Sequence, residues 1–111
     1  MRKQIDYQHF ENVEMRVGTI ISAKMNQKAI KPAYILTIDF GEFGIKKSSA
    51  QITQHYSTDT LIGKQIIAVM NFPDKLIAGV KSEVLVLGCT TEQGTILIQP
   101  DRQTPNGVII A

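Results

Sequence analysis

The sequence contains little of what catalysis, disulfide bonding or membrane insertion would require. Its 111 residues include one cysteine, Cys89, and two histidines, His9 and His55. A lone cysteine makes no internal disulfide, and a zinc site needs about four suitable ligands. No apolar run approaches the ~20 residues of a membrane-spanning helix, and none follows the basic residues near the N-terminus. We therefore expect a cytoplasmic protein without a secretory signal, without membrane insertion and without a metal.

The sequence also offers no set of residues suited to acid–base or nucleophilic catalysis. It has neither the GxxxxGK[ST] phosphate-binding motif nor the GxGxxG dinucleotide-binding motif. Cys89 ends an apolar strand, where we expect a small core residue. Asp39 stands two residues before Gly41 at a strand end, where a carboxylate commonly caps a turn. We expect no enzymatic activity, no catalytic residue and no cofactor.

The charge of the chain is only slightly basic. Twelve lysines and arginines stand against ten acidic residues, for a formal net charge of +2. Dedicated nucleic-acid-binding domains usually leave a stronger basic footprint. Charge therefore leaves open both a nucleic-acid-binding protein and an ordinary soluble one. The apolar fraction of 43% is enough for one core, and we expect residues 1–111 to form a single domain.

The sequence does contain a series of short strands separated by turn signals, which is typical of an all-β barrel or sandwich. In the long first strand, residues 15–24, Gly18 suits a bulge or sharp coil that lets the strand curl around a small barrel. The predicted core-facing residues of this strand are Met15, Val17, Thr19, Ile21 and Ala23. Those of the second strand, residues 34–40, are Tyr34, Leu36, Ile38 and Phe40.

The order of the remaining elements indicates the barrel type. A short helix is predicted at about residues 50–56, between a third strand at 45–49 and a fourth at 65–70. A helix between the third and fourth strands is the arrangement of the OB-fold. The later segments are a fifth strand at 83–87, a sixth at 95–99 and an apolar tail at 108–110. We predict an all-β protein: a small OB-fold β-barrel with one short helix and terminal extensions.

The fourth and fifth predicted strands carry apolar residues on both of their faces. A small antiparallel barrel leaves one face of each strand wet, so these strands need a second cover. The cover is the N-terminal segment 5–10, the tail 108–110 or a second copy of the chain. Because large exposed apolar patches are rare on stable monomers, we favour a homodimer built from the termini and a barrel edge.

Two polar clusters fall at the end of the third strand and around the loop between the fourth and fifth. OB barrels bind oligonucleotides on that loop and the exposed sheet face. Lysines neutralise phosphate, polar side chains donate hydrogen bonds, and an exposed phenylalanine stacks on a base for about 1–3 kcal/mol. In the alternative, Lys46 and Lys47 are solvated residues of an edge strand and Phe72 is a core residue. For Phe72 the core is the better interpretation. The predicted nucleic-acid-binding residues are Lys46, Lys47, Ser48, Ser49, Gln51, Asn71, Phe72, Lys75, Lys81 and Ser82.

The segment from Asn71 to Gly88 resembles a known family. It is similar to the tRNA-binding domain appended to many methionyl-tRNA synthetases. The matching motifs are Asn-Phe-Pro and the later Ile-Ala-Gly-x-Lys-Ser-Glu-Val-Leu-Val-Leu-Gly. The stretch from Ser48 to Ile52 matches the same family, and the resemblance extends over nearly the whole chain. Residues 84–87 lack the glycine-methionine step of the synthetase-appended domains, which favours the CsaA group of small, stand-alone, export-related chaperones.

The resemblance implies an OB-fold homodimer whose terminal extensions help to build the interface. It also implies tRNA binding and the holding of unfolded or export-destined polypeptides, with a link to the SecA translocation motor. Asp74 stands where relatives often have a basic residue, which weakens phosphate binding and leaves peptide binding unaffected. We therefore predict an export-related molecular chaperone with tRNA-binding capacity. The alternative is a stand-alone tRNA-binding protein that recognises the shape of folded RNA.

Overall fold

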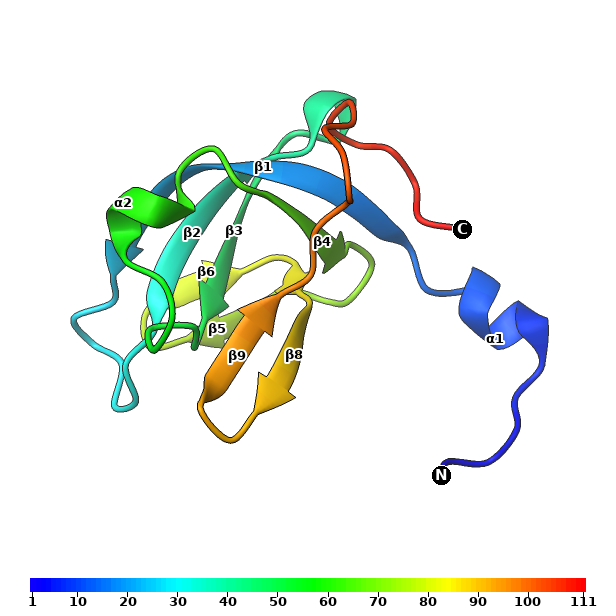
Figure 1. Ribbon diagram of the computed structural model, residues 1–111, viewed down its shortest axis with the longest axis horizontal. Coiled ribbons are helices and arrows are strands. Elements are labelled where there is room, and N and C mark those ends of the chain that lie inside the picture. Colours follow the sequence, from blue (N-terminus) through cyan, green and yellow to red (C-terminus); the bar gives the residue numbers. More distant parts are fainter.

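A five-stranded antiparallel sheet bends round to form the body of the protein (Figure 1). The computed structural model describes residues 1–111, and the strand order in this sheet is β3-β2-β1-β4-β7. The strands are β1 (Met15–Met25), β2 (Tyr34–Asp39), β3 (Ile45–Ala50), β4 (Gln65–Val69) and β7 (Leu85–Val86). The two ends of the sheet approach each other where the Glu83 amide donates to the Lys47 carbonyl at 2.8 Å. The predicted small OB-type barrel is confirmed.

Two hairpins and three short helical segments complete the chain. The hairpins pair β5 (Lys75–Ile77) with β6 (Val80–Ser82) and β8 (Gly88–Thr91) with β9 (Gly94–Leu97). The helical segments are α1 (Tyr7–Glu11), the 3₁₀ turn Gly41–Phe43 and α2 (Thr58–Leu61). Cys89 lies on β8 and is exposed, so its predicted place in the core is wrong. The reason is that the chain leaves the barrel at Gly88 and continues as a projecting hairpin (Figure 1).

The second strand contributes the centre of the core, as its alternation predicted. Tyr34, Leu36, Ile38 and Phe40 are all buried, and the intervening residues face outward. Leu61 from α2 and Ile66 from β4 join the same cluster. After β2, the Asp39 carboxylate accepts a hydrogen bond from the Gly41 amide at 2.8 Å, which confirms its role as a turn cap.

Before its bulge the first strand has the opposite alternation to the predicted one, since Gly18 and Ile20 face the core. A register shift between Ile20 and Ser22 places Ile20 in the core and leaves Ile21 44% exposed, so the predicted inward orientation of Ile21 is wrong. The added residue exchanges the two faces beyond it, so Ala23 pairs with Leu36 and packs against the core, as predicted. Gly18 is not the bulge and pairs regularly with Ile66. A Cβ at Gly18 would lie 2.6 Å from Ile38 and Phe40, so glycine is needed there for close packing.

The helix between β3 and β4 exists but begins later than the predicted residues 50–56. It starts at Thr58 because Ser57 caps it: the Ser57 hydroxyl accepts from the Thr60 amide at 3.3 Å. Serine is a preferred N-cap, so Ser57 marks the start of the helix more reliably than the polar pattern of the preceding residues. The preceding loop is held to the core instead, since the Tyr34 hydroxyl donates to the Tyr56 carbonyl at 2.6 Å.

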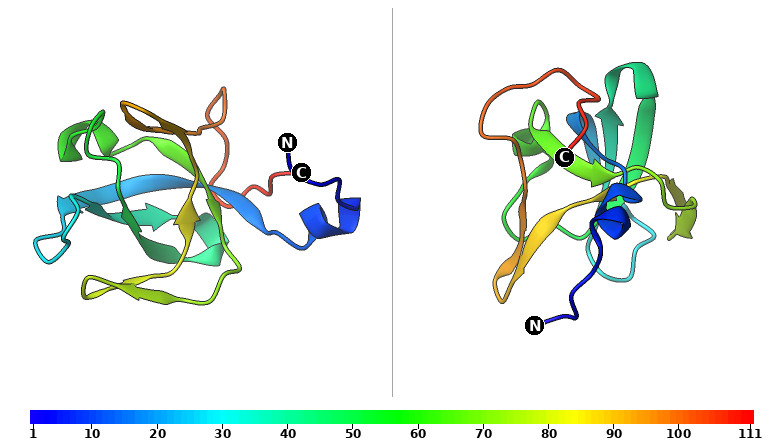
Figure 2. Two further views of the ribbon diagram at one scale, coloured as in Figure 1. Left: turned by 90° about the horizontal axis from the view of Figure 1, so that it is seen from below. Right: turned by 90° about the vertical axis from the view of Figure 1, so that its right-hand side faces the viewer.

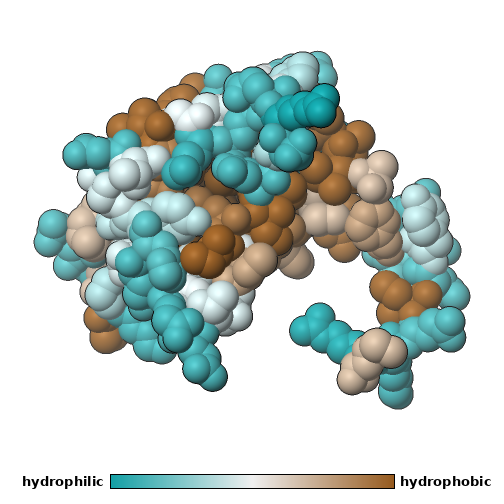
Figure 3. All heavy atoms as spheres, in the orientation of Figure 1, coloured by the Kyte–Doolittle hydropathy of each residue, from teal (hydrophilic) through white to brown (hydrophobic).

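The C-terminal tail lies beside β1, whereas α1 stands away from the barrel and the N-terminus lies beyond it, apart from the C-terminus (Figures 1 and 2). The C-terminal tail runs along β1, where the Val17 amide donates to the Val108 carbonyl and the Ile110 amide donates to the Met15 carbonyl. In the space-filling view an open space separates the N-terminal arm from the barrel, with apolar surface on the barrel beside it (Figure 3). None of the helices has the length and apolar character to cross a membrane.

Candidate functional site

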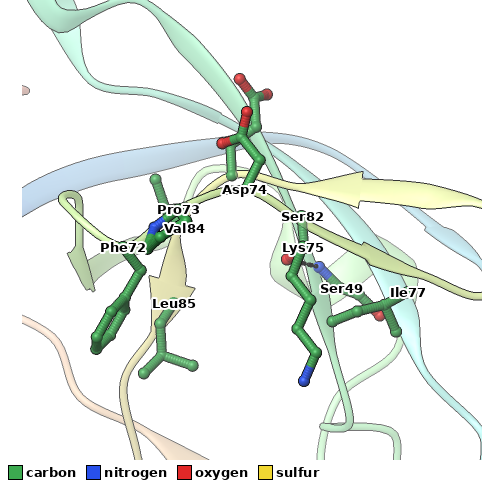
Figure 4. A pocket seen from close by; sticks show the side chains of 10 residues that line it. Ser49, Phe72, Pro73, Asp74, Lys75, Ile77, Ser82, Val84 and Leu85 are labelled. Carbon is green, nitrogen blue, oxygen red and sulfur yellow. Dashed lines mark hydrogen bonds between the residues drawn. The ribbon is translucent and has the colours of Figure 1, made fainter.

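A cavity of about 470 Å³ opens between the β5–β6 hairpin and the start of β7 (Figure 4). Its apolar wall consists of Phe72, Pro73, Ile77, Val84 and Leu85. Its polar lining consists of Ser49, Asp74, Lys75, Ser82 and Glu83. The cavity therefore combines a hydrophobic surface with one exposed cation and several hydrogen-bonding groups, which is the composition of a binding site.

Phe72 and Leu85 form the exposed apolar part of this cavity. Their side chains lie on one side of it, facing Lys75 and Ile77 on the other (Figure 4). Phe72 is 55% exposed and Leu85 is 50% exposed. The interpretation of Phe72 as a core residue is wrong, because the chain leaves β4 at Val69 and carries Phe72 out onto the surface. An aromatic ring in this position is available to a ligand.

Strand alternation divides the polar cluster on β3. Lys46 and Ser48 share the face of Ala50 and pair with core residues of β2, whereas Lys47 and Ser49 lie on the opposite face. Ser48 is 1% exposed, and its hydroxyl donates to the Val84 carbonyl at 2.9 Å. Ser48 therefore helps to close the barrel and presents no group to a ligand, contrary to its place in the predicted site.

Two of the four predicted lysines already have carboxylate partners. Lys81 Nζ lies 3.3 Å from Asp74 Oδ2, and Lys46 Nζ lies 3.9 Å from Glu83 Oε2. Lys47 and Lys75 form no such pair, so their charges are not offset by an adjacent carboxylate. Exposed ion pairs contribute only about 0–1 kcal/mol to stability, but each one reduces the local potential that attracts an anion.

Asn71 lies away from this cavity. Its Oδ1 accepts from the Glu14 amide at 3.0 Å, and its Nδ2 donates to the Asn12 carbonyl at 2.8 Å. Asn71 therefore anchors the N-terminal arm and lines a second cavity of about 350 Å³ between α1, β1 and the tail. Gln51 is exposed and lines neither cavity.

The first cavity thus unites part of the predicted site. The predicted residues that line it are Ser49, Phe72, Lys75 and Ser82. Ser49 and Ser82 are joined there, since the Ser49 amide donates to the Ser82 hydroxyl at 3.1 Å. The sequence-based list missed Ile77, Val84 and Leu85, although the apolar residues at both alternations of 83–87 already indicated a surface that needs a cover. No three His, Cys, Asp or Glu side chains are grouped so that they could bind a metal ion.

Comparison with known proteins adds a family to this geometry. A family model described as a putative tRNA binding domain matches residues 15–108. Similar curated proteins include the methionine–tRNA ligases of Methanococcoides burtonii, 32% identical over 107 residues, and of Flavobacterium johnsoniae, 28% identical over 107 residues. Both alignments cover 96% of this chain. The chain spans only 16% and 15% of the length of these ligases.

Solved structures of whole small proteins are also similar to this chain. Chaperone CsaA of Bacillus anthracis is 46% identical, with a TM-score of 0.93 over 98% of this chain and 100% of that one. The CsaA chaperone protein of Picrophilus torridus is 51% identical, with a TM-score of 0.91 over 97% and 100%. A MetRS-related protein of Pyrococcus horikoshii is 26% identical, with a TM-score of 0.88 over 99% and 100%. These comparisons confirm the resemblance predicted from the motifs.

Proposed function

Because the chain belongs to the putative tRNA-binding domain family, we propose that it binds tRNA and also acts as a molecular chaperone for unfolded or secretory polypeptides. The observation that supports the chaperone activity best is the exposed apolar cavity around Phe72 and Leu85. Two proteins named as CsaA chaperones, at 46% and 51% identity, match it over their entire chains. The family is a binding domain, and we propose no enzymatic activity for this chain.

An unfolded polypeptide presents apolar side chains on an extended backbone, and the cavity offers a complementary surface. Exposed apolar patches on soluble proteins commonly mark sites of interaction with proteins. The clients we propose are export-destined chains in the cytoplasm, delivered to the SecA translocation motor. The resemblance to the CsaA group supports export and SecA, and the single cysteine supports a reducing compartment such as the cytoplasm.

The basic and polar groups near the cavity support tRNA binding. Lys47 and Lys75 carry charges without a neighbouring carboxylate, and Ser49 and Ser82 provide hydrogen-bonding groups. Phosphate contacts of this kind give affinity with little dependence on sequence. A stand-alone tRNA-binding protein that recognises folded RNA shape remains the alternative function, favoured by the match to domains of methionine–tRNA ligases.

The chaperone proposal predicts that Leu85→Ser weakens client binding about tenfold. Covering the exposed half of a leucine is worth roughly 1 kcal/mol, and a serine hydroxyl buried without a partner opposes binding further. The measurement is fluorescence anisotropy with a labelled, reduced and carbamidomethylated α-lactalbumin, which stays unfolded. Suppression of aggregation of a heated client provides a second readout.

Ile62→Ser is the matched control for Leu85→Ser. Ile62 is 55% exposed and lines neither cavity, so this change removes a similar area of apolar surface elsewhere. It should leave client affinity unchanged. If both variants bind the client as tightly as the parent protein, the client lies on another surface. If the parent protein itself binds no client, the chaperone function is wrong and the tRNA-binding alternative is favoured.

We also propose that the protein is a homodimer and that its N-terminal arm lies in the interface. Helix α1 stands apart from the barrel and buries none of its residues. Apolar side chains are exposed on this arm and on the C-terminal tail; they are Ile5, Tyr7, Val13, Val108 and Ile109. The second cavity lies between these two segments, and a second copy would cover both.

The dimer proposal predicts that Tyr7→Asp raises the dimer dissociation constant about ten- to hundredfold. A buried aromatic side chain contributes about 1.5–3 kcal/mol, and each 1.4 kcal/mol is a factor of ten. Sedimentation equilibrium at micromolar concentrations measures the change, with Tyr7→Phe as the conservative control. A monomer mass for the unaltered chain would contradict the proposal. Deletion of residues 108–111 is a less specific test, because the tail also bonds to β1 of its own chain.

A further inference from the structure

The cavity beside Phe72 carries the features proposed for both ligands. Its apolar wall, which suits the side chains of a polypeptide, includes Phe72 and Leu85. Phe72 is also the only exposed aromatic residue among those predicted to contact nucleic acid, and Lys75 lies across the cavity from it (Figure 4). Phe72 would therefore serve both ligands, because its exposed ring can stack on a base of RNA and can also bury an apolar side chain of a client.

The size of the cavity limits what it holds. Its volume of about 470 Å³ is in the lower part of the roughly 300–1,000 Å³ found for small-molecule sites. A single face of Phe72 stacks on one planar or apolar group at a time. A nucleobase stacked on it gains about 1–3 kcal/mol, and a client side chain gains a comparable free energy by burying the same ring. The site has no second exposed aromatic residue to accommodate both.

The charges at the rim favour an unpaired base whose phosphate lies nearby. Lys75 has no carboxylate partner and is free to approach that phosphate, whereas Lys81 is held by Asp74 at 3.3 Å. Single-stranded loops and ends of RNA provide bases that can leave the stack and lie on an aromatic side chain. The cavity therefore suits one exposed base of a tRNA as well as it suits one apolar side chain.

We propose that a nucleobase of tRNA and an apolar side chain of an unfolded polypeptide occupy the same place on Phe72 and exclude each other. This inference rests on the proposed function, since it requires both ligands to bind. It assigns tRNA a regulatory role as well: the concentration of free tRNA sets the fraction of the protein available to clients. The tRNA releases a client by occupying the cavity and needs no change of fold.

The test measures client affinity at increasing concentrations of unlabelled tRNA, at constant ionic strength. The probe is the labelled, unfolded α-lactalbumin used above, and the dissociation constant of tRNA is first measured alone. For mutually exclusive ligands, the apparent dissociation constant of the client rises in proportion to one plus the ratio of tRNA to its own dissociation constant. At a tenfold excess over that constant we expect a rise of about elevenfold, with no plateau.

Two controls distinguish the cavity from general charge effects. Polyphosphate at the same phosphate concentration has no base, and it should displace the client several-fold less effectively than tRNA. Phe72→Ala should weaken the binding of both ligands, whereas Ile62→Ala, at a residue of equal 55% exposure outside the cavity, should weaken neither. Unchanged thermal unfolding of both variants establishes that the fold is intact.

The outcomes separate the inference from the function on which it rests. Suppose that both ligands bind alone, but tRNA leaves the apparent dissociation constant of the client unchanged or raises it only to a plateau. A ternary complex then exists, and the inference is overturned. Equal displacement by polyphosphate, or a Phe72→Ala variant that loses only one ligand, overturns it as well. If either ligand fails to bind alone, the proposed dual function is wrong, and the inference is overturned with it.

Discussion

Replacement of Phe40 by alanine is expected to lower the free energy of unfolding by about 3–5 kcal/mol. Phe40 is fully buried at the end of β2, where its ring packs over Gly18. No side chain at Gly18 is available to fill the cavity that the substitution would leave. Because domains of this size are stable by only about 5–15 kcal/mol, the loss is a large share of the total. Urea denaturation followed by circular dichroism measures it.

Phe72→Ala is the matched control, since it removes the same atoms from a side chain that is 55% exposed. Surface substitutions usually change stability by about 0.5 kcal/mol or less, so we expect a loss below about 1 kcal/mol. The two variants together separate the stabilising phenylalanine from the ligand-binding one. A comparable loss for both would mean that Phe72 packs on the barrel and is not free for a ligand.

The alternation of β2 was predictable because its four core residues lie in a strand without a bulge. The faces of β1 were not predictable along the whole strand, since nothing in the local sequence marks where the extra residue enters between Ile20 and Ser22. Because the strand period is two, one fixed alternation is right on only one side of such a point: here it is wrong for Ile20 and right for Ala23. The barrel type was still predictable, because it depends on the order of the elements.

The β5–β6 hairpin was not predicted, and its turn explains why. Ala78 has φ of 47° and Gly79 has φ of 80° at the turn. Hairpins of this kind are usually recognised by Asn-Gly or Asp-Gly, and alanine seldom adopts positive φ. The sequence therefore predicts a loop in this region, with polar residues suited to binding. The hairpin forms one wall of the cavity, with Ile77 as a lining residue.

The candidate site was predictable as a region and less so as a set of side chains. Residue type alone grouped Ser48 with Ser49, but adjacent residues of a strand face opposite sides, and only Ser49 reaches the cavity. The side-chain amide of Asn71 suits a contact with nucleic acid, but it holds the N-terminal arm instead. Those distinctions depend on long-range contacts with Val84 and Glu14, which a linear sequence does not reveal.

Replacement of both Lys47 and Lys75 by alanine is expected to reduce tRNA affinity at least tenfold. Each lysine without a carboxylate partner can neutralise one phosphate and release its counterion. Two such contacts contribute about 1.4–1.8 to the slope of log affinity against log salt, at roughly 0.7–0.9 per contact. Anisotropy titrations at several potassium chloride concentrations measure the affinity and the slope together. Both should decrease in the double variant.

The matched control replaces Lys46 and Lys81, which removes the same formal charge. These lysines face Glu83 and Asp74 at 3.9 and 3.3 Å, so a phosphate must compete with a carboxylate already in place. Their loss should reduce affinity and slope less than the loss of Lys47 and Lys75. Asp74→Asn makes the opposite change, because it frees Lys81 and should strengthen tRNA binding several-fold while raising the slope. If neither lysine pair nor Asp74→Asn changes the affinity or the slope, the RNA lies on a different face of the barrel.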